Sequence, residues 1–85
     1  MEMEGKMDIL SLDEALLKYI KGRARRGVAL KGLRTRDWLR QSDIAKKLKV
    51  DQSTVSKMES GLIPINKKNA KKLALIFNTD YHIFL

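Results

Sequence analysis

The sequence predicts an all-α fold, and three observations lead to this prediction. Apolar residues recur at three- and four-residue spacing in successive segments, as they do along one face of a helix. Residues that cap helices stand before several of these segments. No stretch alternates apolar and polar residues as a half-buried strand would. With 85 residues, the chain can form one small domain with an appendage. We expect a five-helix domain with an additional N-terminal helix.

The additional helix is expected at about residues 11–26. Ser11 and Glu14 have the spacing of a capping box, in which Ser11 caps the helix and Glu14 reaches back to its N–H group. Apolar side chains follow at helical spacing: Leu12, Leu16, Tyr19 and Ile20. Gly27 is expected to end this helix, although Gly22 could end it earlier.

Charge divides the chain into two predicted parts. Residues 1–26, an N-terminal extension, carry six Lys/Arg against five Asp/Glu, whereas residues 27–85, the predicted domain, carry twelve against five. The net charge of +8 therefore lies mostly on the domain and attracts polyanions, nucleic acid first and an anionic membrane second. There is no apolar run of the ~18–20 residues that span a membrane and no signal-peptide pattern. We expect a cytoplasmic protein without a membrane partner.

A weaker helix is expected over residues 28–38. Gly32 lowers its helix propensity by about 1 kcal/mol relative to Ala. Trp38 and Leu39 are then expected to enter the core. Trp38 could instead stack on a nucleic-acid base, but a Trp more often packs between helices.

Two short helices joined by a tight turn are expected at residues 41–48 and 52–60. Their apolar residues fall at helical spacing: Ile44, Ala45, Leu48, Val55 and Met58. Asp51 can cap the second helix by accepting from an N–H group of its first turn. Gly61 can end that helix. The remaining face carries polar side chains: Gln52, Ser53, Ser56 and Lys57.

The last long helix is expected at residues 67–77. Pro64 interrupts the chain before it, Asn66 can cap its start, and Asn78 can end it in the left-handed conformation. One face is apolar, with Ala70, Leu73, Ala74 and Phe77. A short helix is expected at residues 81–85.

The segment from residue 41 to residue 61 has the residue types that a helix-turn-helix unit needs. Ala45 is small enough for the first helix to cross the second closely. The string Q-x3-A-x4-V-x-Q-S-T-V-S resembles the phage-repressor and Cro-type (XRE-like) helix-turn-helix family, which includes bacterial regulators and some antitoxins. The family often has an Arg seven residues before the Gln and a Glu that ends the second helix, here Arg34 and Glu59. The resemblance covers about residues 28–85.

This resemblance implies a lambda-repressor-like fold and a role for particular side chains. The implied base-reading residues are Gln52, Ser53 and Lys57. The implied contacts to the DNA backbone, some of them mixed with base contacts, are Gln41, Thr54, Ser56, Lys67 and Lys68. Arg34 and Glu59 are implied to form a structural ion pair. Lys49 stands where the family usually has Gly, and a left-handed residue other than Gly costs on the order of 1 kcal/mol there.

The function that the resemblance implies is sequence-specific binding of double-stranded DNA by a transcriptional regulator. We expect a repressor that acts as a homodimer on a palindromic operator. One candidate dimer surface is C-terminal: Tyr81, Ile83, Phe84 and Leu85. The other is on the N-terminal helix: Ile9, Leu12, Leu16, Tyr19 and Ile20. The alternative function is an antitoxin-type protein that binds a partner protein through residues 9–26 and autoregulates through the helix-turn-helix.

The sequence does not favour an enzyme. It has no cysteine and a single histidine, and it lacks a nucleophile with a neighbouring base, a metal-ligand set and a phosphate-binding loop. We therefore expect no catalytic residue, no metal site and no cofactor.

Overall fold

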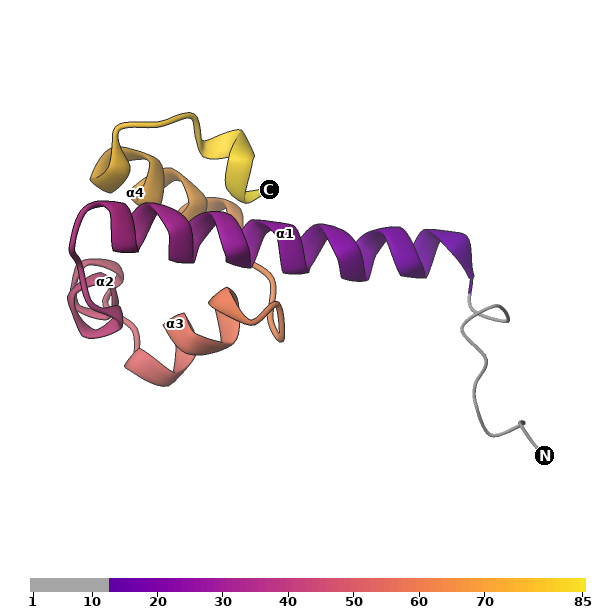
Figure 1. The fold of residues 1–85 in the computed structure, drawn as a ribbon, viewed down its shortest axis with the longest axis horizontal. Helices are drawn as coiled ribbons and strands as arrows, with labels where there is room; N and C mark the ends of the chain where they lie inside the picture. Colours follow the sequence, from indigo (N-terminus) through magenta and orange to yellow (C-terminus); the bar gives the residue numbers. More distant parts are fainter. Residues whose placement is uncertain (1–12) are drawn as a thin grey trace.

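The structure is a computed structural model that describes residues 13–85, which form four α-helices and one short 3-10 helix. The elements in chain order are α1 (Glu14–Arg36), α2 (Gln41–Leu48), α3 (Gln52–Glu59), α4 (Lys67–Phe77) and η2 (Tyr81–Phe84). In Figure 1, α2 and α3 lie on one side of α1, and α4 and η2 lie on the other. The first half of α1 projects beyond the other helices as an arm (Figure 1). No helix within residues 13–85 combines the length and the apolar character needed to cross a membrane.

The predicted break at Gly27 is wrong, because α1 continues through both Gly22 and Gly27. Gly27 is buried against the end of α3. A Cβ atom on Gly27 would lie 2.4 Å from the carbonyl oxygen of Glu59 and 2.5 Å from that of Met58. This glycine therefore serves the close approach of two helices, and it does not end one. The additional N-terminal helix and the first helix of the domain are a single element. Residues 13–85 therefore do not contain the expected five-helix domain with a separate additional helix.

The described part of α1 begins at Glu14 and has a local cap. The Asp13 carboxylate accepts a hydrogen bond from the Ala15 N–H at 3.0 Å. Ser11, the expected cap, and Leu12 lie outside the described residues, as does Ile9.

Left-handed residues follow all four α-helices: Trp38, Lys49, Gly61 and Asn78. The expectations for Lys49 and Asn78 are confirmed, with φ angles of 60° and 54°. After α2, the Val50 N–H donates to the Ala45 carbonyl at 3.0 Å, which is the six-to-one bond of a Schellman turn. The left-handed Lys49 thus sets the tight turn between α2 and α3.

Of the side-chain caps expected for α3 and α4, the structure shows only the cap of α4. Asn66 caps α4, since its side chain accepts from the Asn69 N–H at 2.7 Å. Asp51 precedes α3 in an extended conformation but makes no side-chain capping bond, so that expectation is wrong. α3 instead depends on its packing against α1 and α2.

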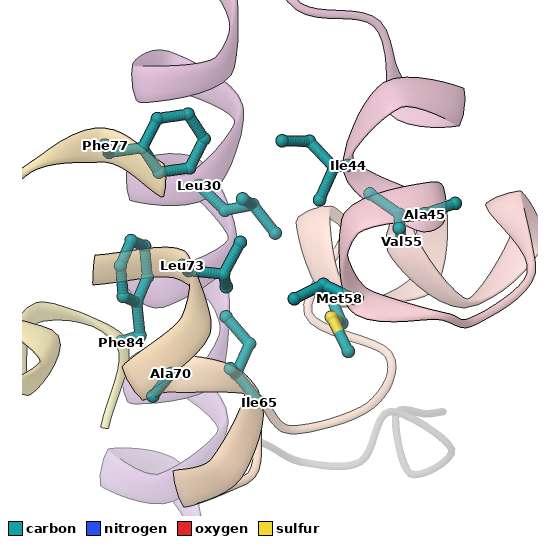
Figure 2. Packing of buried hydrophobic residues seen from close by; sticks show 11 residues of the cluster. Leu30, Ile44, Ala45, Val55, Met58, Ile65, Ala70, Leu73, Phe77 and Phe84 are labelled. Carbon is teal, nitrogen blue, oxygen red and sulfur yellow. The ribbon is translucent and has the colours of Figure 1, made fainter. Parts of the chain in front are cut away.

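Each helix contributes a fully buried side chain to one core. The largest of them come from five different elements: Leu30, Ile44, Val55, Leu73 and Phe84. Figure 2 shows these side chains converging between α1, α2–α3 and α4. Phe84 packs against Phe77 with ring centroids 6.4 Å apart. Because Phe84 is in the core, it is not available to the C-terminal dimer surface considered above.

The prediction that Trp38 enters the core is also wrong, since its side chain is 92% exposed. Trp38 occupies the left-handed position after α1, and its N–H bonds back to the Thr35 carbonyl at 3.1 Å. This turn reverses the chain, so Leu39 packs against the core while Trp38 faces solvent. The backbone of the turn therefore determines which of the two side chains is buried.

Candidate nucleic-acid interface

α3 presents one polar face to solvent. Its opposite face is buried against α1 and α2 by Val55, Met58 and Glu59. The exposed side chains are Gln52, Ser53, Ser56 and Lys57, and Thr54 is partly buried beside them. Positions one turn apart lie next to each other on a helix, so these exposed side chains form a continuous polar face. The predicted base-reading residues therefore share one surface.

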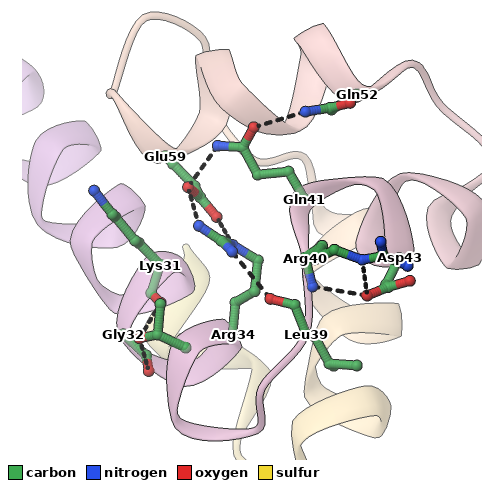
Figure 3. A network of polar contacts seen from close by, with 10 residues as sticks. Lys31, Gly32, Arg34, Leu39, Arg40, Gln41, Asp43, Gln52 and Glu59 are labelled. Atoms are coloured by element: carbon green, nitrogen blue, oxygen red, sulfur yellow. Dashed lines mark hydrogen bonds and ion pairs between the residues drawn. The ribbon is translucent and has the colours of Figure 1, made fainter.

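An ion pair fastens α3 to α1. The Arg34 Nε donates to Glu59 Oε2 at 2.5 Å and its Nη2 donates to Glu59 Oε1 at 3.1 Å (Figure 3). The Arg34 Nη1 also donates to the Leu39 carbonyl at 3.0 Å, which ties the turn after α1 to the same group. The hydrogen bond to Glu59 raises the pKa of the Arg34 guanidinium above its ordinary value, although burial opposes this rise.

Gln41 extends this ion pair to the exposed face of α3. Its Nε2 donates to Glu59 Oε1 at 2.9 Å, and its Oε1 accepts from Gln52 Nε2 at 3.3 Å (Figure 3). The resemblance implied a phosphate contact for Gln41, whereas its side chain here lies between Glu59 and Gln52. A continuous series of bonds thus runs from Arg34 to Gln52.

The start of α2 is held by Asp43. Its carboxylate accepts from the Arg40 backbone N–H at 2.7 Å, as the third residue of a capping box does. This bond is the largest cause of the lowered pKa of the Asp43 carboxyl. The side chain of Arg40 and the charge of Lys46 lower that pKa further, whereas burial raises it. The first-turn N–H groups of Gln41 and Ser42 have no carbonyl partner within α2, so this helix start can receive an anion.

Lys31 is a candidate contact that the sequence reasoning missed. It lines a hollow of about 180 Å³ together with Gln41, Ser56, Glu59 and Ser60. Lys31 lies on α1 one turn before Arg34, so it shares the helix face that packs on α3. That spacing is the signal by which it could have been found. It adds a cationic side chain at the edge of the polar face.

Lys67 and Lys68 are exposed in the first turn of α4. Within residues 13–85 they form no hydrogen bond or ion pair with the polar face of α3. The structure therefore brings Gln41, Gln52 and Glu59 together but leaves these lysines as separate surface cations.

No group of three or more His, Cys, Asp or Glu side chains within residues 13–85 is placed to hold a metal ion. The chemistry that this surface offers is hydrogen bonding by amides and hydroxyls, with cations around it.

Comparison with known proteins identifies the segment that carries this surface. Residues 30–84 match a family model, HTH_3, described as helix-turn-helix. The matched segment is more than half of the chain and includes α2, α3, α4 and η2. No curated protein and no solved structure was found to match.

Proposed function

The chain belongs to the Cro/C1-type (XRE-like) helix-turn-helix family of DNA-binding domains, which are not enzymes. We propose that it is a sequence-specific transcriptional repressor. It acts as a dimer on a palindromic operator, with α3 in the major groove of each half-site. The exposed polar face of α3 supports this proposal, as does the basic excess of residues 27–85.

The observation that carries the proposal is the series of bonds that ends at Gln52. A glutamine amide has two N–H donors and one oxygen acceptor. One donor of Gln52 is engaged by Gln41, which leaves the second donor and the oxygen for N7 and N6 of adenine. Because Gln41 is itself held by Glu59, the amide of Gln52 is oriented before DNA arrives.

The other side chains of the surface have distinct roles in this proposal. Ser53 and Lys57 read bases beside Gln52, with Lys57 suited to O6 and N7 of guanine. The DNA backbone is contacted from both sides of α3 by Gln41, Thr54, Ser56, Lys67 and Lys68. For Gln41 the contact comes from its first-turn N–H group, since its side chain is engaged.

Selection of bound duplexes from a random DNA pool tests the proposed function directly. We expect enrichment of a palindrome whose half-site centres lie roughly 34 Å apart. Recovery of unrelated sequences, at an affinity equal to that of the starting pool, would contradict sequence-specific binding.

The Gln52→Ala variant tests the base-reading role. It is expected to lose about 1–3 kcal/mol of binding free energy on the selected site, because a bidentate contact to one base is removed. Binding to a random duplex serves as the internal control and should change little. An equal loss on both duplexes would mean that Gln52 does not distinguish bases.

A second candidate function is favoured by the exposed apolar side chains of the arm, Leu16, Tyr19 and Ile20. In an antitoxin-type protein this surface would bind a partner protein while the helix-turn-helix autoregulates transcription. DNA binding is common to both candidates, so only the occupant of the arm distinguishes them.

A further inference from the structure

The first half of α1 carries a strip of side chains that the rest of the chain leaves exposed. Leu16, Tyr19 and Ile20 are 44%, 50% and 41% exposed and lie three and four residues apart, on one side of the helix. Arg23, which is only partly exposed, continues the strip, with its guanidinium carbon 4.9 Å from the centre of the Tyr19 ring. We call these four residues the arm strip. Large apolar side chains grouped on a projecting helix are typical of an association surface.

The order of residues in the arm strip is self-complementary. Its positions are symmetric about the midpoint between Tyr19 and Ile20. If two copies of α1 pack antiparallel about that midpoint, Tyr19 of one lies beside Ile20 of the other, and Leu16 lies beside the alkyl stem of Arg23. A two-fold dimer requires such a surface, because the same patch must match itself.

The charges of the arm favour the antiparallel arrangement. The arm begins with two acidic residues, Asp13 and Glu14, and it ends with basic ones: Lys21, Arg23, Arg25 and Arg26. A parallel pair would bring the two basic ends together. An antiparallel pair places each basic end near the acidic end of the other copy, and complementary potentials favour that orientation.

The same arrangement also sets the distance along α1 between corresponding residues of the two copies. Lys31 lies beside Ser56 in the middle of α3, as both line one hollow. It is about eleven residues from the midpoint of the arm strip, or about 17 Å along α1 at 1.5 Å per residue. A two-fold axis through the midpoint of the arm strip and perpendicular to both helices then places the two copies of Lys31 about 34 Å apart along the helix direction.

We propose that the arm strip is the dimer interface of this protein and that its occupant is a second copy of α1, packed antiparallel. The inference rests on the proposed function, because it specifies how the dimer holds its two reading helices. It also assigns the arm to self-association in place of a different partner protein.

Sedimentation of the full chain without DNA tests the interface. The wild-type chain is expected at twice its 9.8 kDa mass, and Ile20→Glu at the mass of one chain, because the substitution places a charge in the interface. Val28→Glu is the matched control, since Val28 is 68% exposed on α1 outside the strip and should stay dimeric. A monomeric wild type, or a dimeric Ile20→Glu, would overturn the proposal. Circular dichroism of all three should show the same helix content.

Disulfide cross-linking tests the orientation, because the chain contains no cysteine. Ile20→Cys is expected to cross-link to itself. Leu16→Cys is expected to cross-link to Arg23→Cys when the two are mixed, but not to itself. Two copies of residue 16 in the antiparallel pair are separated by about 10 Å along the axis, beyond the roughly 7 Å between Cα atoms that a disulfide spans. Self-cross-linking of Leu16→Cys would overturn the antiparallel pairing.

Binding-site selection with the same proteins separates the two proposals. A dimeric Ile20→Glu that selects the same palindrome as wild type would overturn the arm interface while the repressor function stands. A wild type that dimerises through the arm strip, yet selects no DNA sequence, would support the interface and contradict the proposed function.

Discussion

Arg34 and Glu59 form the polar connection on which the position of the polar face of α3 depends. The two side chains are almost entirely buried and make two hydrogen bonds to each other. Arg34 also bonds to the turn after α1, and Glu59 bonds to Gln41. A buried ion pair adds little net stability, because desolvation of the charges offsets their attraction. Its contribution here is geometric, since it joins three elements at one point.

The Arg34→Met variant is expected to lower the free energy of unfolding by about 3–5 kcal/mol, because it leaves the Glu59 carboxylate buried without its cation. The double variant Arg34→Met with Glu59→Leu should recover most of this loss. Urea denaturation of wild type and both variants measures the difference. A double variant no more stable than Arg34→Met would mean that the unpaired charge is not the cause.

At the scale of elements, α1 shows that two glycines in one helix can have opposite roles. Gly27 faces the end of α3, with backbone carbonyl oxygens inside the space a Cβ atom would need. Gly32 has no atom within 4 Å of such a position. The first glycine is required by packing, and the second only weakens the helix.

These contacts predict opposite effects of the same substitution. Gly27→Ala is expected to destabilise the protein by roughly 1–3 kcal/mol or more, since α3 must move away from α1. Gly32→Ala, the matched control, should stabilise it by about 0.4–1 kcal/mol through the lower entropy of the unfolded chain. Thermal unfolding followed by circular dichroism measures both. A neutral Gly27→Ala would contradict the close packing of α3 on α1.

The elements also differ in how strongly they depend on tertiary contacts. α4 has a side-chain cap at Asn66 and a left-handed Asn78 after its end. α3 has eight residues and no side-chain cap. A helix of that length is not stable alone in water, so its polar face is presented only because α1 and α2 hold the opposite face.

At the scale of the whole molecule, the distribution of cations decides how binding depends on salt. Lys67 is exposed at the start of α4. Lys71, further along α4, has its ammonium nitrogen 5.6 Å from the centre of the Tyr81 ring. The two residues carry the same charge on one helix, so they allow a matched comparison.

The Lys67→Ala variant is expected to reduce the slope of log affinity against log salt by about one unit, because one phosphate contact is lost. Lys71→Ala removes the same charge and should leave the slope unchanged. Fluorescence anisotropy on the selected duplex over a range of salt concentrations measures both. An equal change in the two slopes would assign the effect to net charge alone.

Several features could be predicted from the sequence because they depend on neighbours within one or two turns. The spacing of Ile44, Ala45 and Leu48 identifies the buried face of α2, and Asn66 identifies the start of α4. The left-handed Lys49 was implied by the resemblance, because it stands where the family usually has Gly. The outward position of the α3 side chains follows from the same periodicity.

Other features could not be predicted because the relevant partner is distant in the sequence. Local propensity places a helix end at Gly27, but the end of α3 occupies the space beside it. The sequence alone does not fix the orientation of the Gln41 amide, which could face solvent. In the structure, its bond to Glu59 holds it next to Gln52. The large apolar side chain of Trp38 is typical of a core residue, but the turn after α1 directs it to solvent.

The sequence by itself determined the helical character of the chain and the inward faces of α2 and α3, because repeated spacing encodes these features. The motif of residues 41–61 carried the resemblance to the helix-turn-helix family. Only the tertiary structure decided that α1 is one continuous helix with a projecting arm, and that Gln41 joins Glu59 to Gln52. The physical reason is that steric contact and buried hydrogen bonds act between residues that folding alone brings together.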